Sequence, residues 1–463
     1  MSDYIHAAPT TGAAEGARAS TQSRGTQMAW ALYEAARNPF YVLINIYVFS
    51  AYFANRVVGD PVWGQALWGY ILSTAALCVA LCAPLLGTIA DAGGRRKPFL
   101  LACIAVAVPA TAILTLARPD LGGGVLLIAA ALVVANICYE LSSIFYNALL
   151  PQVAPSSRFG RVSGLAYALA NGAGIILFGA YLLADRTLVQ GDGAWPTERF
   201  VPPVVALWWL AFSLPILLKV SDPAANKLPL GKVVGDGLKR LRRSITRLRS
   251  MPDVLHYLIA RMVFNEGFIV LMMFMGVVGS GVLGWGGVQL SVMGLVLSVV
   301  AVGGSLFGGV LDDRLGSKSA LQIVILGCVA SNLLLVTIGP DTVLFMATDP
   351  DATGGLYPRI ADKAFFFAEG LAAFFVTAGL VSSRAMLAKI APRESLNELF
   401  GIYALSGTAT SFLGPLTIAV LTQLFASQRA GLTAGLIFLL GGLSLLRKVS
   451  AGRGDDAAMP ARP

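Results

Sequence analysis

Twelve stretches of predominantly apolar residues, separated by charged residues or by glycine and proline, run along this chain of 463 residues. A helix needs about 20 such residues to cross a hydrocarbon core of roughly 30 Å. The pattern therefore predicts an all-α integral membrane protein with twelve transmembrane helices. The predicted spans cover residues 28–54, 63–90, 98–117, 123–150, 161–184, 200–220, 254–280, 286–311, 319–338, 362–388, 399–425 and 430–447.

Composition supports the membrane prediction. Apolar residues make up 56% of the chain and charged residues 13%, whereas a soluble domain carries about 25% charged residues. So few polar groups cannot cover a protein of this size, so much of its surface must face lipid. The five cysteines lie inside apolar spans without CxxC spacing, and we expect neither a disulfide nor a metal site.

Positive charge alternates between loops and predicts the orientation. Lysine and arginine concentrate in residues 95–97, 158–161, 227–249, 314–318 and 389–393 and are sparse in the intervening loops. Because cytoplasmic loops carry the excess of positive charge, we expect these loops to be cytoplasmic. An even number of spans then places both termini in the cytoplasm, and we expect the protein to lie in the plasma (inner) membrane.

A long internal loop divides the chain. We expect a disordered cytoplasmic tail (1–27), a first bundle (28–220), a linker (221–253), a second bundle (254–447) and a second cytoplasmic tail (448–463).

The linker has the pattern of a basic amphipathic helix. Within residues 232–249, apolar side chains recur every three or four positions among lysines and arginines, at Val234, Leu238, Leu241, Ile245 and Leu248. Such a helix suits the anionic lipids of the inner leaflet. The net charge of +9 has the same origin, so we expect no nucleic-acid partner. We also expect a monomer.

Two short patterns occur once in each half. Residues 87–97 (GTIADAGGRRK) and 309–318 (GVLDDRLGSK) share Gly, Asp and Gly positions at an offset of 222. Residues 148–155 (ALLPQVAP) and 385–392 (AMLAKIAP) match at an offset of 237. Two matches at equivalent places indicate duplicated halves, so we expect the twelve transmembrane helices to form two pseudo-symmetric six-helix bundles. This organisation is typical of secondary transporters with a site between the repeats.

The chain resembles the major facilitator superfamily in its GxxxDxxGRRK loop after the second span and the degenerate copy after the eighth. It further resembles the bacterial and fungal branch related to the autophagy-related vacuolar amino-acid effluxer, from about residue 28 to residue 447. The stretches that carry this second resemblance are WALYEAARNPF (30–40), IFYNALLP (144–151), ARMVFNEG (260–267), SSR (382–384), FGIY (400–403) and GP (414–415).

The resemblance implies that the two loops act as a conformational latch. Asp91 would face the N-terminus of the eleventh helix, whose free amides favour negative charge, and Asp313 would face the fifth helix in the same way. Glycines would allow close approach and a tight turn, and the arginines would link neighbouring helices or lipid phosphates. The alternative is a plain basic loop that sets topology. The predicted latch residues are Gly87, Asp91, Gly94, Arg95, Arg96, Gly309, Asp313 and Gly316.

Ionisable residues inside the spans are few, because burying one costs roughly 2.5–3.5 kcal/mol. The acids among them all fall on the first, fourth, seventh or tenth span, and the resemblance implies that these four helices line a central cavity. Together with two amides they are the predicted substrate or proton-coupling residues: Glu34, Asn38, Glu140, Asn171, Arg261, Glu266, Glu369 and Arg384.

Their depth leaves alternatives open. Glu140 and Glu266 lie near mid-membrane, where a carboxyl group could carry a proton. Arg261 is about 140° around its helix from Glu266, so it would pair with another helix or with a substrate carboxylate. A fixed salt bridge that closes a gate is the alternative for these three. Snorkelling or capping is the alternative for Glu34, Glu369 and Arg384, and helix packing for the amides.

The loops limit the possible functions. None outside the membrane exceeds about 35 residues, and no Walker A pattern occurs, which argues against a catalytic domain and ATP-driven pumping. We expect no enzyme activity and no cofactor. We predict a secondary active transporter that exports a small polar solute by alternating access with proton coupling. The resemblance implies an amino acid or similar solute. A flippase for lipids or lipid-linked substrates and a non-transporting receptor or scaffold stay open as alternatives.

Overall fold

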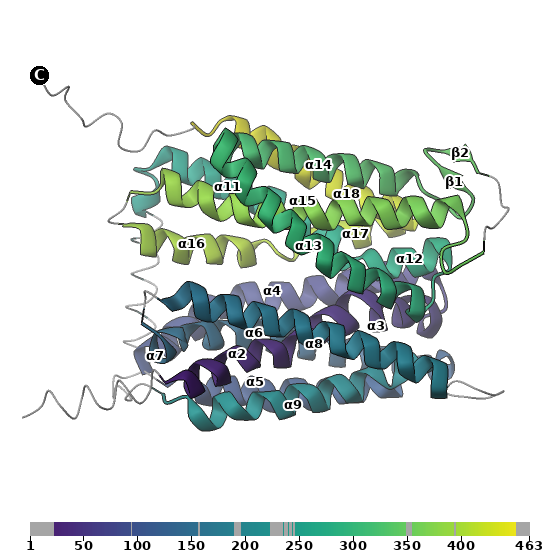
Figure 1. Ribbon diagram of the computed structural model, residues 1–463, viewed down its shortest axis with the longest axis horizontal. Helices are drawn as coiled ribbons and strands as arrows, with labels where there is room; N and C mark the ends of the chain where they lie inside the picture. The colour runs from purple at the N-terminus through teal and green to yellow at the C-terminus, as the bar shows by residue number, and fades with distance from the viewer. Residues whose placement is uncertain are drawn as a thin grey trace, which may run out of the picture.

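The computed structural model describes residues 23–93, 95–155, 158–188, 196–222, 235, 239, 243, 246–348, 354–392 and 395–450, with the backbone alone in 88–93, 120–122 and 397–398. The helices lie side by side along the long axis in two bundles (Figure 1). The described chain begins at Ser23 and ends at Ser450 at the same end, on the left of Figure 1, which we call the terminal end. The opposite end, called the hairpin end, carries a two-stranded β-hairpin.

The elements of the N-terminal half include two π-helices (η1 and η2) and three short 3₁₀ helices (η3, η4 and η6). In chain order they are α2 (Arg24–Pro39), η1 (Phe40–Tyr47), α3 (Phe49–Tyr52), η2 (Phe53–Val57), α4 (Pro61–Gly93), α5 (Lys97–Ile113), η3 (Leu114–Leu116), η4 (Pro119–Gly124), α6 (Val125–Ala148), α7 (Leu150–Val153), α8 (Phe159–Leu188), η6 (Thr197–Arg199) and α9 (Val201–Lys219).

The C-terminal half contains the hairpin, in which Thr342 pairs with Ala347 and Val343 with Met346. Its elements are α11 (Pro252–Met273), α12 (Met275–Leu283), α13 (Gly287–Leu315), α14 (Ser317–Thr337), β1 (Thr342–Val343), β2 (Met346–Ala347), α15 (Ile360–Ile390), α16 (Leu396–Ala409), α17 (Leu413–Leu424) and α18 (Gln428–Arg447).

The all-helical membrane fold predicted from the sequence is confirmed, with one difference in the spans. Eleven helical segments within the described residues are long and apolar enough to cross a membrane. The predicted first span, 28–54, is instead divided among α2, η1, α3 and η2. The predicted tail 1–27 also ends earlier than expected, because α2 begins at Arg24 after Ser23, whose Oγ accepts the Thr26 N–H at 3.3 Å. Most of the predicted linker helix lies outside the described residues.

Pro39 explains why the first span changes from α- to π-helix. Proline has no N–H, so it cannot bond to the carbonyl four residues earlier. That carbonyl belongs to Ala35, and it accepts the indole N–H of Trp208 on α9 at 2.9 Å instead. The π-helix η1 begins at the next residue, Phe40. The second half has similar interruptions between α11 and α12 and between α16 and α17.

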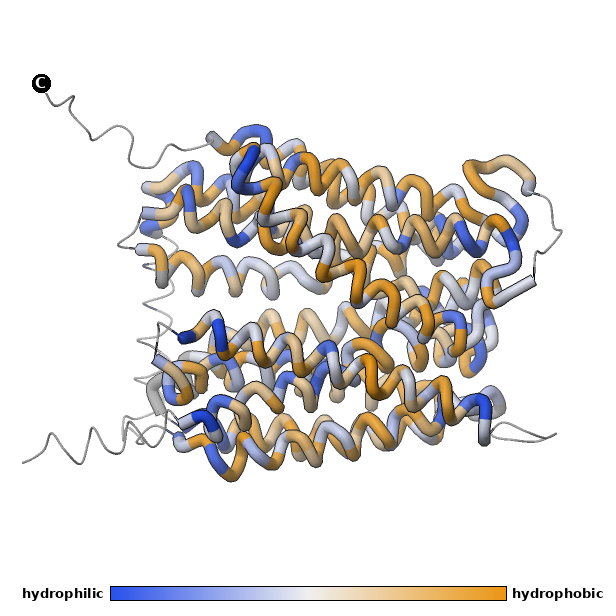
Figure 2. Tube along the Cα trace, in the orientation of Figure 1, coloured by the Kyte–Doolittle hydropathy of each residue, from blue (hydrophilic) through white to orange (hydrophobic). Residues whose placement is uncertain are grey.

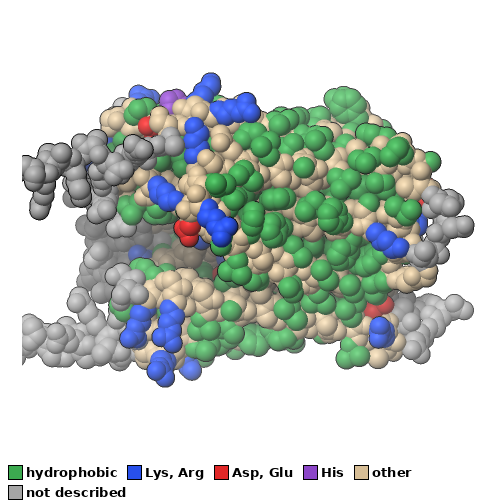
Figure 3. Space-filling model, turned by 45° about the horizontal axis from the view of Figure 1, so that its top comes forward, with side chains coloured by type: hydrophobic (Ala, Val, Ile, Leu, Met, Phe, Trp, Pro, Cys, Tyr) green, Lys and Arg blue, Asp and Glu red, His purple; other side chains and the backbone are tan. Residues whose placement is uncertain are grey.

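The outer surface of the bundle is suited to lipid. Large apolar side chains such as Leu81, Leu126 and Leu218 are each more than 70% exposed. Apolar residues dominate the middle of the helices, and polar residues gather toward the two ends (Figure 2). On the face in Figure 3, hydrophobic side chains form a broad area between groups of lysine and arginine. An exposed apolar belt between charged rims is what a bilayer requires.

The two halves meet tightly at the hairpin end. A β-carbon added at Gly276, in α12, would lie 2.1 Å from the backbone oxygen of Ile46, in η1, so only glycine fits there. Side chains of the first half also donate hydrogen bonds across the interface: Asn55 to the Val277 carbonyl (3.1 Å), Gln65 to Thr422 Oγ1 (2.8 Å) and Tyr70 to Gln423 Oε1 (2.7 Å). These contacts close the hairpin end of the interface.

Candidate functional site

A cavity of about 230 Å³ lies between the two halves, near the middle of their helices. Its polar lining comes from Asn136 and Glu140 on α6 and from Thr408 and Ser411 in the opposite half. The other lining residues are Tyr41, Leu72, Ala75, Ala76, Val79, Ile269, Met273, Gly407 and Pro415. Because both halves contribute walls, movement of one half against the other changes the shape of this cavity.

Glu140 supplies the one carboxylate among the lining residues of this cavity. In the part of the chain that the structure describes, no lysine or arginine forms an ion pair with it. The neighbouring Asn136 is held by Asn45, whose Nδ2 donates to Asn136 Oδ1 at 2.8 Å. Glu140 is therefore a carboxyl group that lines the cavity and is accessible to a ligand or a proton there.

Glu266 lies beside the cavity and is completely buried in α11. Its Oε2 accepts the backbone N–H of Gly414, at the start of α17, at 2.9 Å. Its Oε1 has no hydrogen-bond partner among the described residues. Pro415 accounts for the break that creates this helix start, because it cannot donate to the carbonyl of Ser411. The positive end of α17 thus stabilises a carboxylate that pairs with no cation among the described residues.

Arg261, one of the predicted residues, is buried on α11 and contacts α16. Its Nη1 donates to the Tyr403 carbonyl at 2.9 Å and to Ser406 Oγ at 2.8 Å. The guanidinium also lies 3.6 Å from the centre of the Tyr403 ring. No carboxylate pairs with it among the described residues. Its neighbour Gly407 lines the cavity, and a β-carbon there would lie 3.0 Å from both Nη atoms.

A third repeated pattern, missed in the sequence analysis, connects this arginine with the first half. Residues 33–40 (YEAARNPF) and 257–264 (YLIARMVF) share Tyr, Ala, Arg and Phe at an offset of 224. Comparing the first and seventh spans directly would have found it. Arg37, equivalent to Arg261, lies over the Tyr139 ring at 4.0 Å and donates to the Tyr139 carbonyl at 3.3 Å. Unlike Arg261, it also pairs with an acid, Glu34, at 3.5 Å.

The remaining predicted candidates lie away from the cavity lining. Asn38 donates to the Ala170 carbonyl at 2.7 Å and thereby joins α2 to α8. Asn171 donates to a carbonyl of its own helix. Arg384 is exposed on α15.

The alternative that the Glu369 side chain snorkels toward water is wrong. It is only 3% exposed on α15, and its Oε2 has no hydrogen-bond partner among the described residues. A position near a helix end in the sequence suggests access to water. It does not show whether neighbouring segments cover that end of the helix, as they do at Glu369.

The structure describes only part of the two predicted latch loops. Gly94 and the side chain of Asp91 lie outside the described residues. Arg95 is exposed, and Arg96 donates to the Ala148 carbonyl at the end of α6. The predicted close approach of a neighbouring helix at Gly87 and Gly309 does not occur in this conformation. A β-carbon added at either glycine would meet nothing within 4 Å. Gly316 does form a tight turn, with φ of 80°.

In the second predicted latch loop, the aspartate that forms an ion pair is the neighbour of the predicted one. Asp313 is exposed, whereas the preceding Asp312 is buried and accepts Lys389 Nζ at 2.7 Å. Consecutive helical residues point about 100° apart. The residue that matches the repeat therefore faces outward, and its neighbour faces α15.

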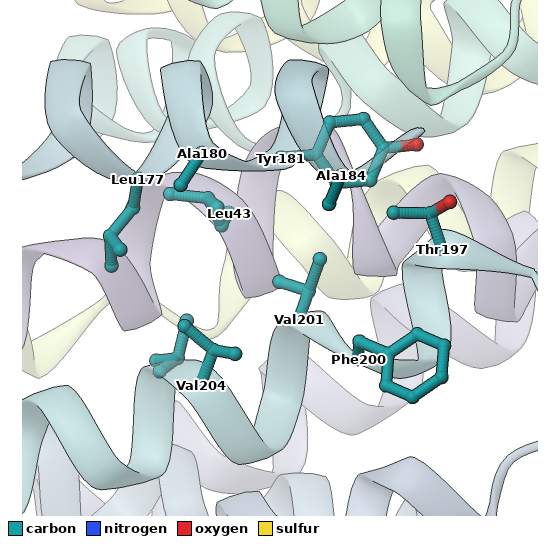
Figure 4. Close-up of a pocket in the computed structure, with 10 residues that line it drawn as sticks. Leu43, Leu177, Ala180, Tyr181, Ala184, Thr197, Phe200, Val201 and Val204 are labelled. Atoms are coloured by element: carbon teal, nitrogen blue, oxygen red, sulfur yellow. The ribbon is translucent and has the colours of Figure 1, made fainter. Parts of the chain in front are cut away.

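A second pocket, between η1, α8 and α9, is almost entirely apolar. Leu43, Leu177, Val201 and Val204 form much of its lining, and the Tyr181 and Thr197 hydroxyl groups lie at one end (Figure 4). No lysine, arginine, aspartate or glutamate lines it. We therefore take the central cavity, with its amide, hydroxyl and carboxyl groups, as the candidate functional site.

Comparisons with known proteins agree on the class of protein. The family model described as "Vacuole effluxer Atg22 like" matches residues 56–459. The chain is 26% identical to the uncharacterized MFS-type transporter YxiO of Bacillus subtilis (strain 168), with 93% of this chain and 96% of YxiO covered. It is 23% identical to Autophagy-related protein 22-1 of Aspergillus niger, with 63% of this chain and 48% of that protein covered. The match thus spans about half of the fungal protein.

Solved structures agree on the fold. A D-xylose-proton symporter aligns over 92% of this chain and 98% of its own, with a TM-score of 0.66 and 15% identity. The nucleoside transporter NupG aligns over 91% and 98%, with a TM-score of 0.63 and 11% identity. The chain belongs to the vacuole effluxer Atg22-like family and is a membrane transporter of the major facilitator superfamily.

Proposed function

We propose that this protein is a secondary active transporter that exports a small polar solute, an amino acid or similar molecule, by alternating access coupled to protons. The observation that carries the proposal is the cavity between the halves, with Glu140 on one wall and Arg261 directly behind the opposite wall. An acidic group in one half and a basic group in the other suit a solute that carries both charges.

The contacts between the halves support alternating access. The interface is closed at the hairpin end by Gly276 and by the hydrogen bonds of Asn55, Gln65 and Tyr70. The positive-inside rule would make the terminal end cytoplasmic. This structure then corresponds to a state closed toward the outside of the plasma membrane, and rocking of residues 28–220 against 254–447 would open it.

Glu266 supports proton coupling. A buried carboxylate without a cation is unfavourable unless it is protonated or hydrogen-bonded. The contact with the start of α17 favours the charged form, and protonation would weaken it. A proton on Glu266 would therefore change how α17 sits on α11. Glu369, equally buried, is the second candidate for carrying a proton.

The proposal can be tested with purified protein in proteoliposomes loaded with labelled amino acids. Efflux should be clearly faster with an acidic exterior than at equal pH, because an inward proton gradient would drive the coupled export of the solute. Glu266→Gln should abolish this acceleration but retain exchange of solute at equal pH. Glu140→Gln should chiefly raise the KM, because it removes a charge that contacts the solute.

Asp60→Asn is the matched control. Asp60 is an exposed acid at the hairpin end that accepts the N–H groups of Val62 and Trp63 through Oδ1, and asparagine caps helices equally well. This variant should behave like the wild type. Movement of labelled phospholipid without solute flux would favour a flippase. No flux of any labelled amino acid, sugar or lipid would favour a receptor or scaffold and contradict the proposal.

A further inference from the structure

A small cavity of about 160 Å³ lies at the terminal end of the second half, away from the central cavity. Residues of the turn between α13 and α14 form one side, and the last two turns of α15 form the other. The lining residues are Leu315, Gly316, Ser317, Lys318, Ser319, Met386, Lys389 and Ile390.

The start of α14 lines this cavity with backbone amides that donate to no described group. The first helical hydrogen bond runs from Ala320 N to the Gly316 carbonyl at 3.0 Å. The amides of residues 317–319 therefore have no carbonyl of their own helix to donate to. No side chain caps this 21-residue helix. A helix start without a cap is a place where an anion is stabilised by the amides and the helix dipole.

Ser317 gives independent evidence for a ligand. The residue lines the cavity but is only 4% exposed, and its Oγ has no hydrogen-bond partner among the described residues. Buried hydroxyl groups are rarely left unpaired, and each such case needs an explanation. An oxygen atom of a ligand in the cavity would satisfy this hydroxyl together with the free amides.

The two lysines give the cavity a positive charge. Lys318 Nζ donates to the carbonyls of Arg447 (3.2 Å) and Val449 (2.6 Å), which fixes the ammonium group without neutralising it. Lys389 pairs with Asp312, which does not line the cavity. The local balance of two cations and one anion, added to the helix dipole, favours a negatively charged ligand.

Apart from Ser319 and the glycine of the turn, the rest of the lining is apolar. Leu315 is 52% exposed, and Met386 and Ile390 complete a hydrophobic side next to the polar one. A phosphate group attached to a hydrocarbon tail would match both sides, whereas a free ion would match only the polar one.

We propose that the start of α14, with Ser317, Lys318 and Lys389, binds a phosphate group, supplied by the headgroup of an anionic phospholipid or by free phosphate. Three amides and the Ser317 hydroxyl contact the phosphate oxygens, and the two lysines balance their charge. The binding site does not depend on the proposed export function. Its place at the inner leaflet rests on the proposed orientation.

The test uses the full-length protein in a neutral detergent. Its apparent melting temperature is measured with added phosphatidylglycerol, phosphatidylcholine or inorganic phosphate at constant ionic strength. Phosphatidylglycerol should raise the melting temperature by at least about 2 °C because it binds the folded state. Ser317→Asp places a fixed negative charge at the helix start and should weaken this binding about tenfold, while Ser317→Ala should weaken it about fivefold through the lost hydrogen bond.

Ser427→Asp is the control, since Ser427 caps α18 at the other end of its half and aspartate also caps well. This variant should bind like the wild type. An effect of phosphatidylglycerol alone assigns the site to lipid, and an equal effect of inorganic phosphate assigns it to the free ion, provided that both respond to the Ser317 variants. No stabilisation by either probe, or stabilisation unchanged in Ser317→Asp, would overturn the proposal.

Discussion

The two halves place an equivalent arginine on their first helices but give it different partners. Arg37 contacts α6 and has an acid, Glu34, within 3.5 Å. Arg261 contacts α16 through a carbonyl and a hydroxyl and has no carboxylate partner among the described residues. The charge is neutralised locally in the first half, whereas in the second half it is held only by dipoles.

The second half also carries Glu266, a completely buried acid that pairs with no cation among the described residues. Glu266 lies on the same helix as Arg261 and contacts α17, the other part of the interrupted eleventh span. Arg261 on α11 thus contacts α16, and Glu266 on the same helix contacts α17. Each of the two pieces of the eleventh span is held by a different charge. Ligand or proton binding would change these contacts more easily than the ion pair of the first half, so we expect the second half to respond during transport.

The largest expected difference is between the two arginines. Arg261→Met removes two hydrogen bonds from a charged donor and should destabilise the protein by about 3 kcal/mol and lower the transport rate at least about 100-fold. Arg37→Met removes one such bond and should cost about half as much, because Glu34 is 28% exposed and can be hydrated. Thermal unfolding and proteoliposome flux measure both.

A double variant separates charge from packing. Glu34→Gln combined with Arg37→Met should recover part of the stability lost in Arg37→Met, since it removes the unpaired acid. Equal losses for Arg37→Met and Arg261→Met would mean that the different partners have no energetic consequence.

The helix interruptions offer a smaller effect. Pro415→Ala restores an N–H that can bond to Ser411, so α16 and α17 can join and the Gly414 amide can leave Glu266. We expect transport to fall about tenfold without loss of thermal stability, since proline inside a helix costs about 3 kcal/mol.

Pro39→Ala is the matched change in the first half. It should alter transport by about twofold at most, because Ala35 O already accepts a hydrogen bond from Trp208. A loss of transport as large as that of Pro415→Ala would show that the interruption of the eleventh span has no special role.

The smallest effect concerns the ion pair between Lys389 and Asp312. Lys389→Met should destabilise the protein by about 1 kcal/mol, because the lysine side chain is half exposed and the buried aspartate loses its partner. Adding Asp312→Asn should restore most of this. At the equivalent positions the first half has Ala90 and Gln152, so Gln152→Met should change the melting temperature little. A larger change there would contradict an ion pair specific to the second half.

Much of the fold could be predicted from the sequence because crossing a bilayer requires apolarity over a local stretch. Repeated loops also indicated the duplication, and the arginine pattern at 33–40 and 257–264 could have added to it. The position of Glu140 on the cavity matches the expectation that acids of the cavity helices face inward, although its role remains a prediction.

Which atoms meet depends on the tertiary structure. The repeat in the sequence points to Asp313, but the rotation between consecutive helical residues turns Asp312 toward Lys389. The twelve apolar stretches, their duplication and the lipid-facing surface follow from the sequence by itself, since each depends on composition within a short segment or between copies. The partners of Arg261 and Glu266, the burial of Glu369 and the closed hairpin end depend on segments far apart in the chain. Only the packing of complete helices brings those segments together.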